Sequence, residues 1–158
     1  MPKFETTRHV RHAPEAMFAL VADVERYPEF LPLCEALSVR SRKDRDGQTI
    51  LVADMTVGYK AIRETFTSQV HLKPAENRID VQYIDGPFKY LSNVWRFESA
   101  GLGACDIHFS IDYEFKSRLL AMVMGSMFDR AFRMFAEAFE KRADIIHGSP
   151  AGAALRPA

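Results

Sequence analysis

The chain of 158 residues is poor in the features that mark several large classes of protein. It has two cysteines, Cys34 and Cys105, without paired spacing, so we expect no disulfide framework and a reducing compartment. No run approaches the ~20 apolar residues of a membrane span. The N-terminal stretch MPKFETTRHVRH also lacks the hydrophobic core of a secretory signal. Contact with a membrane is therefore expected only at its surface.

An excess of charge of one sign is also missing, because 21 Lys and Arg residues balance 21 Asp and Glu residues. A protein that binds nucleic acid through its phosphates should be strongly basic, so the composition argues against DNA as a partner. A small basic cluster remains at Arg40, Arg42, Lys43 and Arg45, and the simplest interpretation is the solvated tip of a hairpin.

The sequence contains no familiar catalytic or metal-binding motif. There is no G-x-S-x-G elbow and no phosphate-binding glycine loop, and Gly101–Gly103 is typical of a turn before a strand. His9 and His12 stand three apart on an expected strand, so their side chains face opposite sides and are poorly placed to share a metal. Cys34 could be a nucleophile, but no partner can be named, and a buried inert thiol is the simpler interpretation. We therefore predict no metal site and no covalent cofactor.

The dominant regular feature is the stretch from Ser117 to about Ala143, which lacks proline and predicts one long helix. Ser117 is the expected N-cap, and Lys141 and Arg142 stand where a C-terminal turn favours cations. A broad apolar stripe at helical spacing consists of Leu120, Met124, Met127, Phe128, Ala131, Phe135, Ala138 and Phe139.

The first half of this helix, from Leu119 to Phe128, is apolar on nearly every side. Such a helix should be covered on more than one side. Two interpretations are open. The first is ordinary core packing. The second is that methionine and phenylalanine side chains form an adjustable roof over a cavity for a hydrophobic ligand.

The rest of the chain predicts one strand, two short helices and then six more strands. The first strand is expected over residues 3–11, a helix begins at 13–15, and a short helical turn lies between Pro28 and Pro32. Period-two alternation then runs from Glu35 to Phe115, with a hairpin turn at 44–47, a link at 58–60, and strands at 49–57, 61–72, 79–84, 90–98 and 105–115. Short turns between consecutive strands favour an antiparallel meander, so the fold class is α+β with about seven strands against one long helix.

Alternation also predicts which polar side chains face the apolar interior. Glu64 and Ser68 fall on the apolar side of their strand, whereas Thr67 falls on the solvent side. Arg8 joins the inward set and is the natural partner of Glu64, since a buried charge is costly unless it is paired. The alternative is that Glu64 lies near a strand end and reaches water.

Two segments together resemble one known family. They are Val21–Cys34 (VADVERYPEFLPLC) and Asp85–Phe97 (DGPFKYLSNVWRF). Both are similar to segments of the coenzyme Q-binding START-like proteins, and the resemblance extends over about residues 3–146. It implies a helix-grip fold, in which a bent antiparallel sheet wraps around a long C-terminal helix and encloses a cavity.

The resemblance implies three functions among which the sequence does not decide. The first is non-catalytic binding of ubiquinone or a similar polyprenyl lipid in support of respiration. The second is that of the bacterial members identified as ribosome association toxins, which would contact a ribosomal subunit through an outer face. The third is a cyclase or dehydrase, which would need an acid/base pair that is not visible here. Because no transit extension precedes the domain, we expect a cytoplasmic protein, peripheral at the inner membrane face if it meets a membrane.

The candidate ligand-binding residues are the inward side chains of the strands and the apolar stripe of the helix. They are Met55, Glu64, Phe66, Tyr83, Phe88, Leu91, Asn93, Trp95, Phe97, Tyr113, Leu120, Met124, Phe128 and Phe132. Asn93, Tyr83 or Arg8 would bind a polar head group, and Phe88 would lie at the mouth of the cavity and touch a membrane. The ligand-binding domain is expected over residues 1–146, with a disordered tail over 147–158 that is rich in small residues.

Overall fold

The computed structural model describes residues 3–59 and 61–148. The elements in chain order are β1 (Lys3–Val10), α1 (Pro14–Ala22), η1 (Val24–Glu29), β2 (Cys34–Arg45), β3 (Gln48–Tyr59), β4 (Ile62–Lys73), η2 (Pro74–Glu76), β5 (Arg78–Asp85), β6 (Phe88–Ser99), β7 (Cys105–Phe115) and α2 (Arg118–His147). Residues 149–158, which make up most of the predicted tail, lie outside the described part. Lys60, the last residue of the predicted link at 58–60, also lies outside it.

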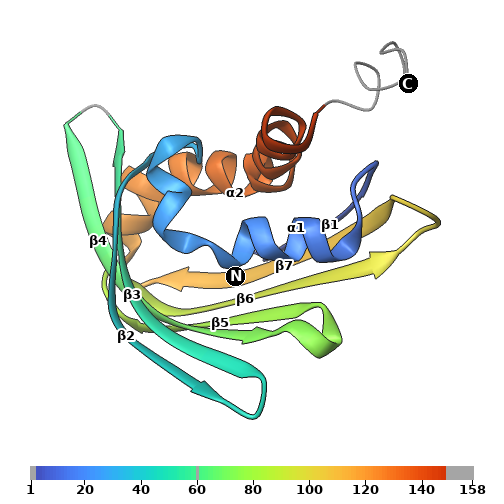
Figure 1. Ribbon diagram of the computed structural model, residues 1–158. Coiled ribbons are helices and arrows are strands. Elements are labelled where there is room, and N and C mark those ends of the chain that lie inside the picture. The colour runs from blue at the N-terminus through green and yellow to red at the C-terminus, as the bar shows by residue number, and fades with distance from the viewer. Residues whose placement is uncertain (1–2, 60, 149–158) are drawn as a thin grey trace.

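The strands form one antiparallel sheet in the order β1-β7-β6-β5-β4-β3-β2. The sheet is curved, and α2 lies across its concave side together with α1 and η1 (Figure 1). The predicted α+β architecture, a curved antiparallel sheet with a long C-terminal helix, is confirmed.

The alternation of side chains explains how the sheet acquires a buried face. Along β7 every second residue is buried, and the same holds for β6 from Leu91 to Phe97, as predicted. Thr67 on β4 is an exception, because it was expected in solvent but is only 7% exposed. Its hydroxyl donates a hydrogen bond of 2.5 Å to Asp54 on the neighbouring strand, and this pairing covers it.

The hairpin between β2 and β3 turns at Asp46 and Gly47, as predicted. Both residues have positive φ angles, 53° and 77°. Two consecutive residues in the left-handed region suit a tight turn whose twist matches that of the flanking strands, and aspartate and glycine are the residues that tolerate it.

The long helix begins as predicted and ends later. The Ser117 hydroxyl accepts a hydrogen bond of 3.1 Å from the backbone N–H of Leu120, which makes it the N-cap. The helix continues to His147 because nothing before Gly148, with a φ angle of 85°, interrupts it. Lys141 and Arg142 are therefore not in the last turn, and the prediction that they complement the helix C-terminus is wrong.

The prediction that the first half of α2 is covered on more than one side is also wrong. Leu119 is 68% exposed, Met122 80% and Val123 52%. Only the face that carries Met124, Met127 and Phe128 is buried, because only that face meets the sheet. The opposite face of this segment is apolar and uncovered.

Arg8 does not pair with Glu64. Its guanidinium donates to Glu140 of α2 at 2.6 Å. The strand order explains the error, because β7, β6 and β5 stand between β1 and β4. Glu64 lies opposite Val57 near the start of β4 and is partly exposed, which agrees with the alternative that it sits near a strand end.

Phe88 lies in the core and is 0% exposed, so the prediction that it reaches a membrane surface is wrong. Its ring stacks on Phe115 at 4.9 Å and meets Phe128 edge-on at 5.2 Å. The turn before it folds tightly onto the sheet at Gly86, where a Cβ atom would stand 2.6 Å from that of Phe66. Glycine at this position, with φ of 144°, lets the chain carry Phe88 inward.

Candidate functional site

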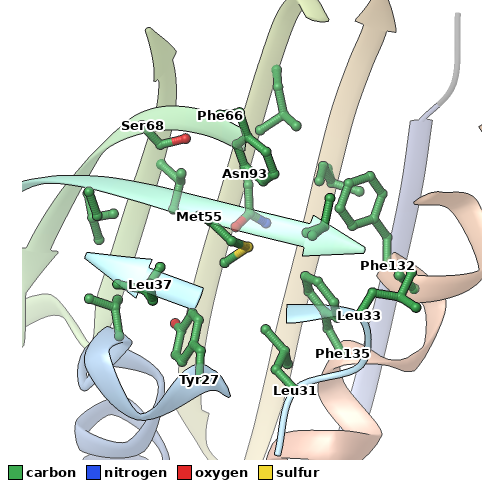
Figure 2. A pocket seen from close by; sticks show the side chains of 18 of the residues that line it. Tyr27, Leu31, Leu33, Leu37, Met55, Phe66, Ser68, Asn93, Phe132 and Phe135 are labelled. Atoms are coloured by element: carbon green, nitrogen blue, oxygen red, sulfur yellow. The ribbon is translucent and has the colours of Figure 1, made fainter. Parts of the chain in front are cut away.

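A cavity of about 90 Å³ lies between α2, η1 and the concave face of the sheet. Half of the predicted ligand residues line it: Met55, Phe66, Leu91, Asn93, Trp95, Phe128 and Phe132. These side chains come from three strands, β3, β4 and β6, and from the middle of α2. Alternation on the strands and the apolar stripe of the helix bring them together, as Figure 2 shows for Met55, Phe66, Asn93 and Phe132.

The other predicted residues do not line this cavity. They are Glu64, Tyr83, Phe88, Phe97, Tyr113, Leu120 and Met124. Beneath the first half of α2 the space is filled, because Phe88 contacts Phe115, Phe128 and Tyr113 within 6 Å between ring centres. The predicted tunnel under residues 120–132 is therefore displaced: the α2 residues that line the cavity run from Phe128 to Phe139.

The prediction missed the wall contributed by η1 and the loop after it. Val24, Tyr27, Leu31, Pro32 and Leu33 all line the cavity. A signal for this wall was present in the sequence, because apolar side chains set between prolines in a short loop must be buried against something. The direction in which the loop folds could not be derived from the pattern alone.

Ser68 and Asn93 bring polar side-chain atoms to this apolar cavity. The Ser68 hydroxyl is buried and has no hydrogen-bond partner among the described residues, and the Asn93 side-chain amide donates to the Ser110 carbonyl at 2.7 Å. Both side chains reach from the sheet towards the same space (Figure 2). A buried hydroxyl without a partner is rare and unfavourable in a folded protein. It therefore marks a place where a ligand atom could be bound.

The other polar groups near the cavity are already engaged. Tyr27 lines it, but its hydroxyl donates to the Val21 carbonyl, and burial raises the pKa of this phenol. Tyr83 accepts a hydrogen bond of 3.1 Å from the Phe88 N–H, and burial raises its pKa as well. Of the three head-group candidates, Asn93 alone lies at the cavity; Tyr83 does not line it, and Arg8 pairs with Glu140.

The chemistry of the lining is that of a binding site. Among the described residues that line the cavity there is no carboxylate, imidazole, thiol or amine side chain. Cys34 and Cys105 form no disulfide, and burial raises the pKa of each thiol to about 11. Over residues 3–59 and 61–148, no cluster of His, Cys, Asp and Glu could hold a metal ion. None of the helices in this part combines the length and the hydrophobicity that a membrane span requires.

A curved antiparallel sheet, closed by a long C-terminal helix over an apolar cavity, defines the helix-grip class of folds. A family model described as "Polyketide cyclase / dehydrase and lipid transport" matches residues 10–140, and the chain belongs to this family. The ribosome association toxin RatA of Vibrio cholerae is 34% identical over 139 residues, which are 88% of this chain and 93% of that protein. The mitochondrial coenzyme Q-binding protein COQ10 homolog B of Xenopus laevis is 33% identical over 139 residues, 85% of this chain and 54% of its own.

Solved structures agree with this fold. The solution structure of an 18 kDa protein from Caulobacter crescentus is 33% identical, has a TM-score of 0.77, and matches 94% of this chain and 100% of its own. A START superfamily protein from Mycobacterium smegmatis has a TM-score of 0.74 at 21% identity, over 91% of this chain and 98% of its own. The second likeness bears on the fold alone. The expected START-like fold is therefore confirmed.

Proposed function

We propose that the protein binds a hydrophobic lipid of the polyprenyl quinone type, such as ubiquinone, without catalysing its conversion, and that it thereby supports respiratory electron transport. The observation that carries the proposal is the buried, unpartnered Ser68 hydroxyl in an otherwise apolar cavity. A relative named as a coenzyme Q-binding protein supports the choice of quinone.

The proposed ligand matches both properties of the cavity. A quinone ring offers carbonyl oxygens that accept hydrogen bonds, and Ser68 can donate one. The apolar part of the ligand gains about 0.8 kcal/mol for each buried CH₂-sized unit, and aromatic and aliphatic side chains supply the surface. One hydrogen bond to a group that otherwise has none adds selectivity for a molecule with a polar end.

The size of the cavity limits how much of the ligand it holds. Pockets for whole small molecules measure roughly 300–1,000 Å³. A cavity of about 90 Å³ accepts only one end of a polyprenyl quinone unless side chains move. Met55 is the most adaptable of the lining residues, because its unbranched thioether has several low-energy rotamers.

The proposal is tested by purifying the protein from a respiring host and identifying organic-extractable lipids by mass spectrometry. A variant with Ala53→Leu fills the cavity from β3, so the quinone should be lost from the purified protein. Ala36→Leu is the matched control, since Ala36 is exposed on the adjacent strand and should keep the lipid. A wild-type protein without any bound lipid, which also fails to bind added quinone, contradicts the proposal.

A second candidate function is association with a ribosomal subunit, favoured by the relatives named as ribosome association toxins. The contact would be the β2–β3 hairpin, where Arg42 and Lys43 are exposed, while Arg40 is bound to Asp54 at 2.7 Å. Overexpression followed by sucrose-gradient profiles tests it. Joined subunits should decrease with the wild type and recover with Arg42→Glu and Lys43→Glu together. Unchanged profiles with the wild type exclude this function.

An enzymatic role of the cyclase or dehydrase kind is the third function that the family suggests. It requires an acid or a base at the ligand, and Glu64, the one carboxylate among the candidate ligand-binding residues, does not line the cavity. We therefore place binding before catalysis. A turnover that Glu64→Gln abolishes while the fold is kept would reverse this order.

A further inference from the structure

A second apolar depression lies on the outside of the molecule, next to the wall of the cavity. It is a groove of about 380 Å³. One side consists of Val123, Met127 and Met134 of α2, and the other side consists of Tyr59 and Ile62, at the end of β3 and the start of β4. The groove lies along the border between the buried and the exposed side of α2, since Met127 is buried whereas Val123 and Met134 are exposed.

The groove and the cavity share part of their lining. Pro32, Leu33 and Ala131 line both, so a single layer of side chains separates the two spaces. The loop residue in this layer, Leu33, has a φ angle of 66°, a backbone conformation that leucine rarely adopts. Its carbonyl accepts a hydrogen bond of 3.0 Å from the Gly58 N–H, which holds the loop on β3. Backbone strain of this kind persists where the surrounding structure enforces it, often beside binding sites.

Part of the apolar surface of α2 is not used in packing against the sheet. Residues Val123, Met127, Arg130 and Met134 recur at intervals of three or four and share one face. Val123 is 52% exposed, Met134 43%, and Tyr59 across the groove 41%. These side chains are exposed in the described part of the chain, and they surround a space of the size that small ligands occupy.

We propose that this groove binds the apolar tail of the ligand whose polar end lies beside Ser68, and that the Pro32–Leu33 loop and Ala131 form the gate between the two spaces. The inference rests on the proposed function. A long hydrocarbon chain exceeds the cavity of about 90 Å³, and the groove is an apolar space that shares a wall with it. In Figure 2, Leu33 lies on the same side of the cavity as Phe132 and Phe135, and Ser68 lies away from them. A chain that extends from Ser68 past Leu33 enters the groove.

The test compares two quinones that have the same ring, one without a tail and one with a long polyprenyl tail. Their affinities are measured by quenching of the fluorescence of Trp95, the single tryptophan, which lines the cavity. The test variant is Val123→Asp, which places a charge in the groove. Met122→Asp is the matched control, because Met122 is an exposed apolar residue of the same helix that does not line the groove. A second test variant, Ser126→Phe, fills the groove without adding a charge and leaves Trp95 as the single tryptophan.

The long-tailed quinone should bind the wild type more tightly than the tail-less one. Val123→Asp and Ser126→Phe should each weaken the binding of the long-tailed quinone at least tenfold. Neither variant should change binding of the tail-less quinone, and Met122→Asp should change neither ligand. The inference is overturned if the tail adds no affinity, if the groove variants bind the long-tailed quinone normally, or if Met122→Asp weakens it equally. A wild type that binds neither quinone overturns the proposed function itself, and the inference with it.

Discussion

Replacing Ser68 with alanine should stabilise the ligand-free protein and weaken its binding of ligand. Ser68 is 6% exposed, and its hydroxyl has no hydrogen-bond partner among the described residues. Leaving such a group unpaired costs about 1–3 kcal/mol, and alanine removes the group with little change in volume. The free energy of unfolding should therefore rise by up to about that amount, or the melting temperature by about 2–4 °C per kcal/mol for a domain of this size.

The neighbouring residue provides a matched control. Thr67 also carries a buried hydroxyl, but it points to the other face of β4 and donates to Asp54. Thr67→Ala should lower stability by about 1.5–3 kcal/mol, since the lost hydrogen bond has a charged acceptor, and should leave ligand binding unchanged. Urea unfolding of the ligand-free proteins and Trp95 quenching by quinone give the two readouts. A Ser68→Ala variant that is less stable than the wild type, or that binds quinone as tightly, would refute the reasoning.

Three further predictions concern the core and the charged surface. Trp95→Ala should lower stability by about 3–5 kcal/mol, whereas Glu64→Ala should be tolerated; melting curves in the reverse order would contradict the assignment of the sheet faces. Phe88→Ala should cost about 3–5 kcal/mol, measured by urea unfolding, and a near-neutral effect would mean that this ring is not the centre of the aromatic cluster. Asp80→Asn should be less stable than the wild type at neutral pH, with the difference closing as the pH falls below about 4; a constant difference in unfolding experiments at several pH values would argue against a shifted carboxyl.

The last of these rests on a pKa that is lowered in the folded state. Burial alone would raise the pKa of Asp80, but hydrogen bonds from Lys73 and Arg78 outweigh it, and the net result is a pKa below the ordinary value of 3.8. The two cations stand 2.7 Å and 3.0 Å from the carboxylate. Because the unfolded chain then binds a proton more readily than the folded one, the stabilisation is present above the ordinary pKa and is lost as the pH falls through the folded value.

The fold could be predicted from the sequence because its signals are local. Alternation over β6 and β7, the Asp46–Gly47 turn and the Ser117 cap each depend on a few neighbouring residues. The inward set follows from alternation once the strands are placed. This is why half of the candidate ligand residues were found at the cavity.

The errors concern contacts between elements that are distant in the sequence. Arg8 meets Glu140 because α2 passes β1, and no periodicity within either segment encodes that approach. Phe88 was assigned to a mouth because it follows a turn, but the turn at Gly86 folds onto Phe66 and turns the ring inward. The wall at Leu31–Leu33 was missed for the same reason, since the path of a loop is decided by what it packs against.

The strand order has a consequence for how the molecule assembles. The two edges of the sheet are β1 and β2, which follow one another in the chain but stand at opposite ends of the layer. Strands β2 to β7 are joined by short reversals and can pair as local hairpins. By contrast, β1 must find β7 across about two thirds of the length of the chain, with Lys3 opposite Asp112. Closure by β1 is thus expected to be the slow step of refolding. Until β1 pairs with β7, the exposed edge of β7 can pair with β1 of another copy of the protein. The yield of refolding should therefore fall as the protein concentration rises.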